Sequence, residues 1–435
     1  MIFRKKRAKA WAAQLEHGNA DQSYWSRVKN TFSKNRLAVW ALRGLMVLVF
    51  IGVFSDFIAN EKPIWCRIEG KTYWPVFKEY GVKMGFSTWE KQFFIKDWNE
   101  HNYDAKVMAL IPYSGHSHDR KNTQFKSPFG DQDVSSTRYW HWLGTDQLGR
   151  DTAAGLVSGT RMALLVGLIA MSIATIIGLF FGAIAGYFGD QRLKISRGRL
   201  LLNIIGFPLA IFYGFSTRGF ILSETNHFYL QLLLCVFIFV GIMLLFNLLA
   251  KVLKSVHFLS QKITIPADLL IMRFVEAIES IPGLLFILAM VSIFSQLSIF
   301  NVMVVIGLIA WTGITRFVRA ELLRVRQLNY VEAAQAMGYP ERNIIFRHAL
   351  PNALTPVLII IAFGIAGAIL SEAFLSFLGI GLDTSVNVTW GSMLSLARDK
   401  FTAWWLALFP GIAIFITVSI FNLIGEGLSE ALLEK

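Results

Sequence analysis

The sequence has little cysteine and little charge. Only two of its 435 residues are cysteines, Cys66 and Cys235, and they stand far apart in different contexts. This excludes a disulfide framework and a cysteine metal site, and it leaves Cys235, inside an apolar run, as a packing residue. Charged residues make up 16% of the chain and hydrophobic residues 54%, with a mean hydropathy of +0.49. Such a composition is rare in soluble proteins and predicts a membrane protein.

A basic stripe suited to nucleic acid is also missing, although the formal net charge is +13. Nucleic-acid binding needs a basic groove, often with interleaved aromatic residues. The Lys and Arg residues stand instead in short segments beside apolar runs, as they do in proteins oriented in a bilayer. We therefore expect contact with membrane lipid and no nucleic-acid partner.

Catalytic motifs are absent from the sequence as well. It has no paired-carboxylate pattern, Gly-x-Ser-x-Gly elbow, His-Glu-x-x-His or Cys-x-x-Cys motif. His116 and His118 in "SGHSH" are nearby histidines in a loop, a pattern more typical of polar surface than of a metal site. The sequence predicts no covalent chemistry, no metal site and no enzyme.

One stretch, "GTDQLGRD", has the glycine spacing of a phosphate-binding loop. Arg150 stands where such a loop needs lysine, and Asp151 stands where it needs a hydroxyl for magnesium. The Asp151 carboxylate would repel phosphate. We predict a structural role instead, in which Thr145 or Asp146 caps a short helix and Gly149 forms a tight turn before the next span.

Apolar runs of about 20 residues, long enough to cross a bilayer, recur along the chain. The first follows a basic amino terminus and lacks the features of a cleaved secretory signal, so it is predicted to be retained. The weakest contains Gly206 and Pro208 and fits either a kinked span or a re-entrant segment. The eight predicted spans are 37–58, 162–187, roughly 200–217, 228–250, 270–295, 298–315, 355–377 and 404–425.

The loops between these runs differ in charge. Residues 191–199 carry four cationic residues, 251–262 carry three and 316–347 carry six arginines, whereas 218–227 carry one and 296–297 none. Because positive loops stay in the cytoplasm, we predict a multi-pass inner-membrane protein with both termini cytoplasmic.

These patterns divide the chain into segments. A long outer segment mixes aromatic residues with charges of both signs, which is too aromatic for a disordered linker and predicts a small folded cap or docking surface. The predicted segments are a cytoplasmic amino terminus (1–36), a first span (37–58), an extracytoplasmic insertion (59–161), a span (162–190), an inserted segment with two spans (191–266), a core (267–428) that includes a cytoplasmic loop (316–354), and a cytoplasmic tail (429–435).

The cytoplasmic loop contains a polar helix-turn-helix pattern, "NYVEAAQAMGYPERNIIFRHALPN". Its first helix carries small residues, including Ala333 and Ala334, that let another backbone approach closely, with Glu332 in the first turn. Gly338 ends this helix, and Pro340 begins a second one. The pattern predicts insertion into the groove of a partner; the alternative is an amphipathic helix resting on the bilayer surface.

The motif "EAAQAMG", followed by "LP", resembles the EAA signature of ABC importer permeases. The segments "WLGTDQLGRD", "GAIAGYFGD", "IFRHALPN", "SEAFLSFLGIGL", "WGSML" and "WLALFPGIAIFITVSIFNLIGEGL" extend this resemblance to the permeases of the oligopeptide and dipeptide importers, the OppC/DppC family. Residues 59–80 are most similar to the YejE-type branch. The resemblance implies an all-α polytopic membrane protein with a type I permease core, about eight spans and an extracytoplasmic insertion.

The resemblance also implies partners and sites. The partners are a second homologous permease, two ATPase subunits that bind ATP and Mg, and an extracytoplasmic substrate-binding protein; no cofactor belongs to this chain. The cargo is expected to be peptides or peptide-like compounds, with nickel or another small solute as the alternative. Residues expected to couple to the ATPase are Glu332, Ala333, Ala334, Gly338, Arg347, His348 and Pro351.

Two features depart from the family pattern. His348 stands where the general EAA pattern has an aliphatic residue, although the peptide branch accepts "RH-LPN" there. Residues 191–266 match nothing in the usual six-span core, but their two spans preserve the topology on both sides.

Acidic residues inside the predicted spans are candidates for the translocation pathway, because charged groups near lipid usually face protein or a cavity. These are Glu276, Glu279 and Glu372; the alternative is solvation at a helix end or bonding between helices. A self-contained secondary transporter would instead show inverted repeats and a mid-membrane ionisable cluster, and a membrane-anchored sensor would need a cytoplasmic output domain. Neither pattern is visible in the sequence.

Overall fold

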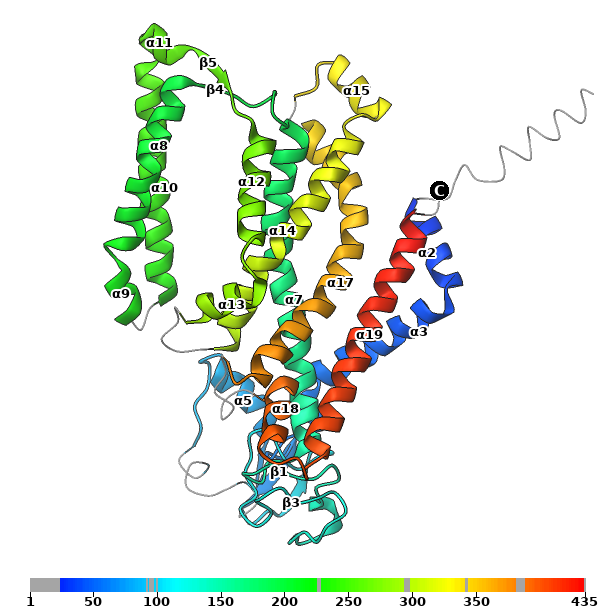
Figure 1. Cartoon of the computed structure of the whole chain (residues 1–435). Coiled ribbons are helices and arrows are strands. Elements are labelled where there is room, and N and C mark those ends of the chain that lie inside the picture. The colour runs from blue at the N-terminus through cyan, green and yellow to red at the C-terminus, as the bar shows by residue number, and fades with distance from the viewer. Residues whose placement is uncertain are drawn as a thin grey trace, which may run out of the picture.

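The computed structural model describes residues 24–90, 93, 98, 101–224, 228–292, 298–340, 343–380 and 388–433. Helices dominate it, and seven of them are long and apolar enough to cross a membrane (Figure 1). The prediction of an all-α polytopic protein is confirmed. The long helices are α3 (Arg36–Val53), α7 (Thr152–Ala183), α8 (Arg197–Ile211), α10 (Phe228–Val252), α14 (Ile299–Val325), α17 (Leu350–Phe377) and α19 (Trp405–Leu433).

An eighth apolar segment is a bent pair of helices, which forms either a broken span or a re-entrant loop. Helix α12 (Ala267–Glu279) and helix α13 (Gly283–Val291) meet at an angle of 83°, where the sequence predicted one span over 270–295. Pro282 precedes α13 and explains the break, because proline cannot donate a helical hydrogen bond and disfavours helical geometry in the residue before it. The stretch "SIPG" indicated a helix break, but the prediction gave more weight to the apolar residues around it.

Helix α7 lies in the middle of the bundle and packs along α14 (Figure 1). A stripe of glycines at every fourth position allows this approach. A Cβ atom added at Gly178 would lie 2.7 Å from the Ile314 Cβ, and one added at Gly182 would lie 2.7 Å from the Val318 Cβ. Small residues at this spacing bring membrane helices into backbone contact. The helix continues into a π-helical turn, η3 (Ile184–Phe188).

The other core helices surround this pair. Helix α17 packs against α7, α14 and α19, while α3 packs against α19 and α7. Helix α18 (Trp390–Asp399) lies between the ends of α17 and α19 and begins with a capping box in which the Thr389 and Ser392 side chains each accept a backbone N–H. Helix α2 (Tyr24–Lys34) lies beside the carboxyl-terminal part of α19.

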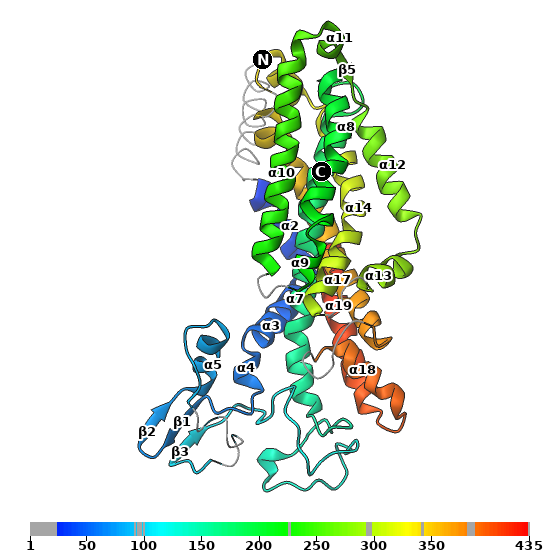
Figure 2. The same cartoon turned by 90° about the vertical axis from the view of Figure 1, so that its left-hand side faces the viewer.

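The described residues of the segment 59–151 lie at the end of the molecule opposite α15 (Figure 1), and Figure 2 shows the same end in the view turned by 90°. The segment holds a three-stranded antiparallel sheet in the order β2-β1-β3, built from β1 (Trp65–Ile68), β2 (Lys71–Tyr73) and β3 (Ala105–Val107). It also includes the helix α5 (Pro75–Lys83) and the short 3-10 helix η2 (Thr137–Tyr139), while the short helix α4 (Ser55–Ile58) precedes it. We call residues 59–151 the cap. Helix α7 begins at Thr152 rather than at residue 162, because Asp151 caps it.

The inserted segment is a helical hairpin. Helix α8 runs into the π-helical turn η4 (Phe212–Ser216), so residues 197–221 form a continuous candidate span that holds Pro208. The short helix α9 (Gly219–Glu224) precedes α10, which is followed by η5 (Leu253–Ser255) and α11 (His257–Ser260). Strands β4 (Lys194–Ser196) and β5 (Lys262–Thr264) pair antiparallel at the base of the hairpin. Figure 1 shows the hairpin beside the core, joined to it through these strands.

Candidate functional site

The EAA segment forms helix α15 (Asn329–Ala336), which follows α14 after a short turn. Gly338 terminates the helix, as the sequence predicted: it follows the last residue, Ala336, and the capping residue Met337, and its φ is +76°. The Gly338 N–H donates to the Gln335 carbonyl at 3.0 Å, and the Tyr339 N–H donates to the Ala334 carbonyl at 3.2 Å. These bonds make a Schellman motif, which requires the left-handed conformation that glycine adopts without strain.

One face of α15 is anchored in the protein. Val331 is fully buried and Ala334 is 6% exposed, and both join a cluster that contains Leu322 and Val325 of α14 and Tyr187 of η3. An eight-residue helix is marginal in water, so this burial stabilises α15 in place. Burying the Val331 side chain contributes about 1.5–3 kcal/mol. Because the buried face contacts protein, it is not the face that would rest on lipid.

The opposite face of α15 is open. Glu332 and Ala333 are exposed, and so are the large side chains of Met337 (68% exposed) and Tyr339 (50%). This face combines a carboxylate in the first turn with small and apolar side chains next to the tight turn. It is an apolar surface on an anchored element, the form that a docking site for another protein takes.

The second part of the motif returns the chain to the core. The π-helix η6 (Ile344–Ala349) leads directly into α17, and Ile344 and Ala349 are buried in the same cluster as Val331. Arg347 and His348 lie in η6 and Pro351 lies at the start of α17, but their side chains are outside the described part of the chain. The backbone from α14 through α15 to α17 is therefore tied to one core at both ends.

Arginines from the predicted loop connect α14 to its neighbours. Arg319 binds Asp268 of α12 through both carboxylate oxygens, and Arg316 forms an ion pair with Glu279 at the end of α12. Arg326 donates to the Tyr187 carbonyl at 3.3 Å, which links the start of the loop to the end of α7. These contacts connect α14 to α12 and to η3, which continues α7.

The three acidic pathway candidates lie in different environments. Glu276 is half-exposed and pairs with Arg273 at 2.8 Å in the same helix. Glu279 pairs with Arg316 of α14. Glu372 is only 2% exposed, and its Oε1 accepts the Ser376 hydroxyl at 2.7 Å. The structure does not bring the three carboxylates together, and each has a bonded partner.

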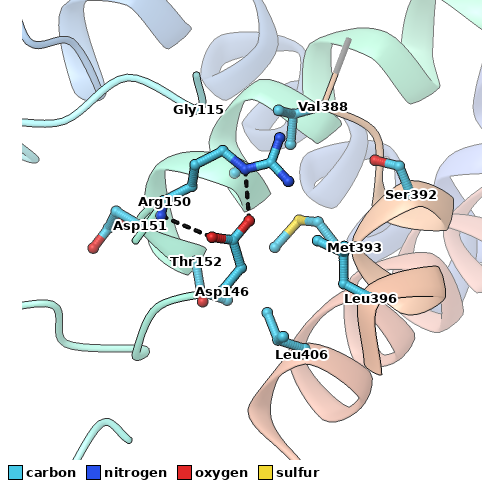
Figure 3. A pocket seen from close by; sticks show the side chains of 11 residues that line it. Gly115, Asp146, Arg150, Asp151, Thr152, Val388, Ser392, Met393, Leu396 and Leu406 are labelled. Atoms are coloured by element: carbon cyan, nitrogen blue, oxygen red, sulfur yellow. Dashed lines mark hydrogen bonds and ion pairs between the residues drawn. The ribbon is translucent and has the colours of Figure 1, made fainter. Parts of the chain in front are cut away.

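The stretch that imitates a phosphate loop has the structural role predicted for it, but the capping residue was wrong. Asp146 accepts the N–H groups of Leu148 and Arg150, each at 2.9 Å, and its side chain pairs with that of Arg150 at 2.6 Å (Figure 3). Its oxygens are therefore occupied within the turn. Asp151 caps α7 instead, accepting the Ala154 N–H at 2.7 Å. Gly149 forms the predicted turn, with φ +80°.

The same turn borders a small cavity between the cap and the core. It has a volume of about 20 Å³ and is lined by the Asp146–Arg150 pair and Thr152 on one side and by Ser392 and Met393 of α18 on the other (Figure 3). Such a volume suffices for about one water molecule. The Thr152 hydroxyl is buried without a hydrogen-bond partner in the described structure, so it provides a polar group for that water.

A buried histidine connects the cap to α7, a role that no pattern in the sequence indicated. His141 is fully buried, with its Nδ1 2.8 Å from an Asp151 oxygen and its Nε2 3.2 Å from an Asp119 oxygen. Burial would raise the pKa of the Asp119 carboxyl, but hydrogen bonds from Asn122, the Lys121 N–H and His141 outweigh it and hold that pKa below its ordinary value. The partners lie in three separate stretches, so no local motif marks this cluster.

Replacing His141 with leucine is expected to loosen the cap. The change removes one hydrogen bond from each of two carboxylates, and a hydrogen bond to a charged group contributes about 1.5–3 kcal/mol. Limited proteolysis of the purified protein should show faster cleavage within 59–151. The control is His118→Leu, because His118 is exposed in the same cap. Equal cleavage rates in the two variants would refute the assignment.

Comparisons with known proteins agree with this architecture. Residues 258–435 match the family model described as "Binding-protein-dependent transport system inner membrane component". The oligopeptide transport system permease protein OppC of Haemophilus influenzae is 30% identical over 294 residues, which cover 67% of this chain and 70% of that protein. The inner membrane ABC transporter permease protein YejE of Escherichia coli is 26% identical over 416 residues, covering 94% and 96%. The peptidoglycan transport system permease protein YejE of Agrobacterium fabrum is 27% identical, covering 92% and 90%.

Proposed function

Because the chain belongs to the family of binding-protein-dependent transport system inner membrane components, we propose that it is the permease subunit of an importer for peptides or peptide-like compounds, driven by separate ATPase subunits that dock on α15. The resemblance found in its motifs is thereby confirmed at the level of the family. This family consists of membrane permeases and not of enzymes. The peptide cargo is supported by the names of the relatives, which include oligopeptide, dipeptide and glutathione permeases.

One observation carries the coupling role of α15: the helix is anchored by Val331 and Ala334 while its opposite face is exposed. A lever needs such an arrangement, because a force on the open face must reach the spans without being absorbed by a flexible loop. The buried cluster connects α15 to α14 and α17, and the arginine contacts connect α14 to α12 and α7. Closure of the ATPase subunits on α15 would therefore move these helices together.

The proposed complex contains this chain, a second homologous permease, two ATPase subunits and an extracytoplasmic substrate-binding protein. ATP and Mg are bound by the ATPase subunits. The α15 end of the bundle then faces the cytoplasm, with both termini on that side of the inner membrane, and the cap faces outward where a substrate-binding protein arrives. The distribution of Lys and Arg among the loops supports this orientation.

Reconstitution tests the proposal directly. The chain is purified with its co-expressed partners, placed in liposomes, and supplied with a substrate-binding protein and labelled peptide. Accumulation should require ATP, and the purified complex should contain ATPase subunits. Uphill transport by this chain alone, or failure to associate with any nucleotide hydrolase in its own cell, would refute the coupling role of α15.

Cysteine accessibility tests whether Glu372 lines the pathway. The native cysteines give a low background, because Cys66 and Cys235 are fully buried and burial raises the pKa of the Cys66 thiol to about 11. In the Glu372→Cys variant we expect a small polar thiol reagent to react only when ATP and substrate drive the cycle, because the position is closed in the present conformation.

The control for this labelling is Phe415→Cys in α19, a position 70% exposed on an apolar surface. A polar reagent should not reach it from lipid. If Glu372→Cys stays unlabelled under every condition, the carboxylate holds α17 to its neighbours and does not line the pathway. The same assay applied to Glu276 and Glu279 should give labelling without ATP, because both side chains are already partly exposed.

A further inference from the structure

The inserted hairpin presents an apolar surface over most of its length. In the 18-residue apolar stretches that identify the spans Arg197–Ile221 and Leu230–Val252, only 17% and 6% of the residues are buried. Its polar side chains bond to one another: Asn247 donates to Asn203 at 3.1 Å, and Arg218 donates to Gln231 at 2.8 Å. A hairpin that satisfies its polar groups internally and exposes apolar ones suits surroundings of lipid.

One end of this hairpin is strongly basic. Between Asp190 and Asp268 the sequence has a single acidic residue, Glu224, which lies at the other end of the hairpin. The two flanking carboxylates are engaged elsewhere, because Asp190 accepts the Leu269 N–H at 2.9 Å and Asp268 binds Arg319. The cationic residues with described side chains at this end, which we call the basic end, are Arg192, Lys194, Arg197, Arg199, Lys251 and Lys262.

The fold gathers these charges from distant parts of the sequence. Pairing of β4 with β5 places Ser196 opposite Lys262 and Lys194 opposite Thr264, so cations from the start and the end of the insertion lie on adjacent strands. Figure 1 shows these strands and α11 at the same end of the molecule as α15. The orientation of a membrane protein by its positive loops does not require cations from distant parts of the sequence to lie together. Cations in separate loops orient the protein equally well.

Apolar side chains border the basic end. Val252 is 73% exposed and Phe258 is 59% exposed, and the Arg197 guanidinium lies 4.9 Å from the centre of the Phe258 ring. Cations that adjoin exposed apolar groups at the end of a span lie at the depth of the lipid headgroups. Phosphates at that depth supply the negative charge that the chain itself does not.

We propose that the basic end of the inserted hairpin binds the phosphate headgroups of anionic phospholipids. Clusters of four to eight cations beside a membrane span bind such headgroups, each cation adding to the attraction. Bound lipid keeps the hairpin in its membrane-spanning orientation next to the core. The hairpin is joined to the core through the β4–β5 base. The inserted segment is thus a lipid-anchored addition to the permease, and this role does not depend on the cargo or on the ATPase partners.

Native mass spectrometry of the purified full chain tests this inference. Phosphatidylglycerol and phosphatidylcholine with identical acyl chains are titrated separately. The wild-type chain should bind phosphatidylglycerol about tenfold or more tightly than phosphatidylcholine. The variant Lys194→Gln/Arg199→Gln/Lys262→Gln should lose this preference, whereas Lys194→Arg/Lys262→Arg, which keeps the charge, should retain it.

A matched control removes the same charge elsewhere on the same side. Lys29→Gln/Lys34→Gln/Arg36→Gln neutralises exposed cations on α2 and at the start of α3 and should leave the preference intact. The inference is overturned if the wild-type chain shows no preference, which would favour a protein partner for this end. It is also overturned if the control loses the preference equally, if the charge-keeping variant loses it, or if millimolar inorganic phosphate displaces the lipid.

Discussion

Replacing Gly338 with valine is expected to abolish ATP-driven uptake while the permease remains folded in the membrane. A Cβ at this position meets nothing within 4 Å, so the cost is not a steric clash with a neighbour. It comes from the backbone, whose φ of +76° is an outlier for a β-branched residue and costs about 1–3 kcal/mol. We expect the chain to relieve this strain by opening the Schellman turn. The end of α15 then no longer keeps its orientation relative to the core.

The measurement is uptake of labelled peptide by the reconstituted complex, together with the amount of ATPase subunit that co-purifies. Asparagine tolerates the left-handed conformation, so Gly338→Asn should keep most of the uptake. A second control is Gly85→Val in the cap, where φ is +78° and nothing lies within 4 Å. It imposes the same local strain far from α15. Wild-type uptake by Gly338→Val would contradict the role assigned to this turn.

Local signals explain why the candidate site was predictable. A glycine after a short helical run and a proline two residues later specify a helix end and a turn without reference to the rest of the chain. The sequence therefore predicted the end of α15 and the separation of its two parts. It did not show that Val331 and Ala334 are the anchoring residues, because that depends on packing against α14 and η3.

Non-local contacts explain what the sequence did not predict. The sequence predicted that Thr145 or Asp146 caps a short helix before the next span. The Asp146 side chain is instead paired with Arg150, and the residue that caps a helix in this stretch is Asp151, at the start of α7, which His141 contacts. Ser376 lies one turn from Glu372 in α17, but the burial of Glu372 also depends on Thr389 at the start of α18, which no local pattern gives. The glycine stripe of α7 is different. Its four-residue spacing was visible in the sequence, but only the structure shows that α14 packs against these glycines.

Replacing Gly182 with leucine is expected to prevent the permease from folding. Even a Cβ at this position would lie 2.7 Å from the Val318 Cβ and 2.9 Å from the Thr315 carbonyl oxygen. The obstacle includes backbone, so a change of side-chain rotamer in α14 does not relieve it. Overpacking of this kind costs about 1–3 kcal/mol for a small insertion, and leucine adds further atoms to the same contact.

Fluorescence-detected gel filtration of a tagged chain measures this effect as loss of the monodisperse peak. Gly182→Ala should show a partial loss, because alanine introduces the Cβ clash alone. Gly241→Leu in α10 is the matched control, since a Cβ there meets nothing within 4 Å and the position is also in a long apolar helix. If Gly182→Leu gave the same peak as Gly241→Leu, α7 and α14 would not need backbone contact. The ion pairs and hydrogen bonds of the α14 arginines would then be the contacts that transmit motion, without α7 packed rigidly against α14.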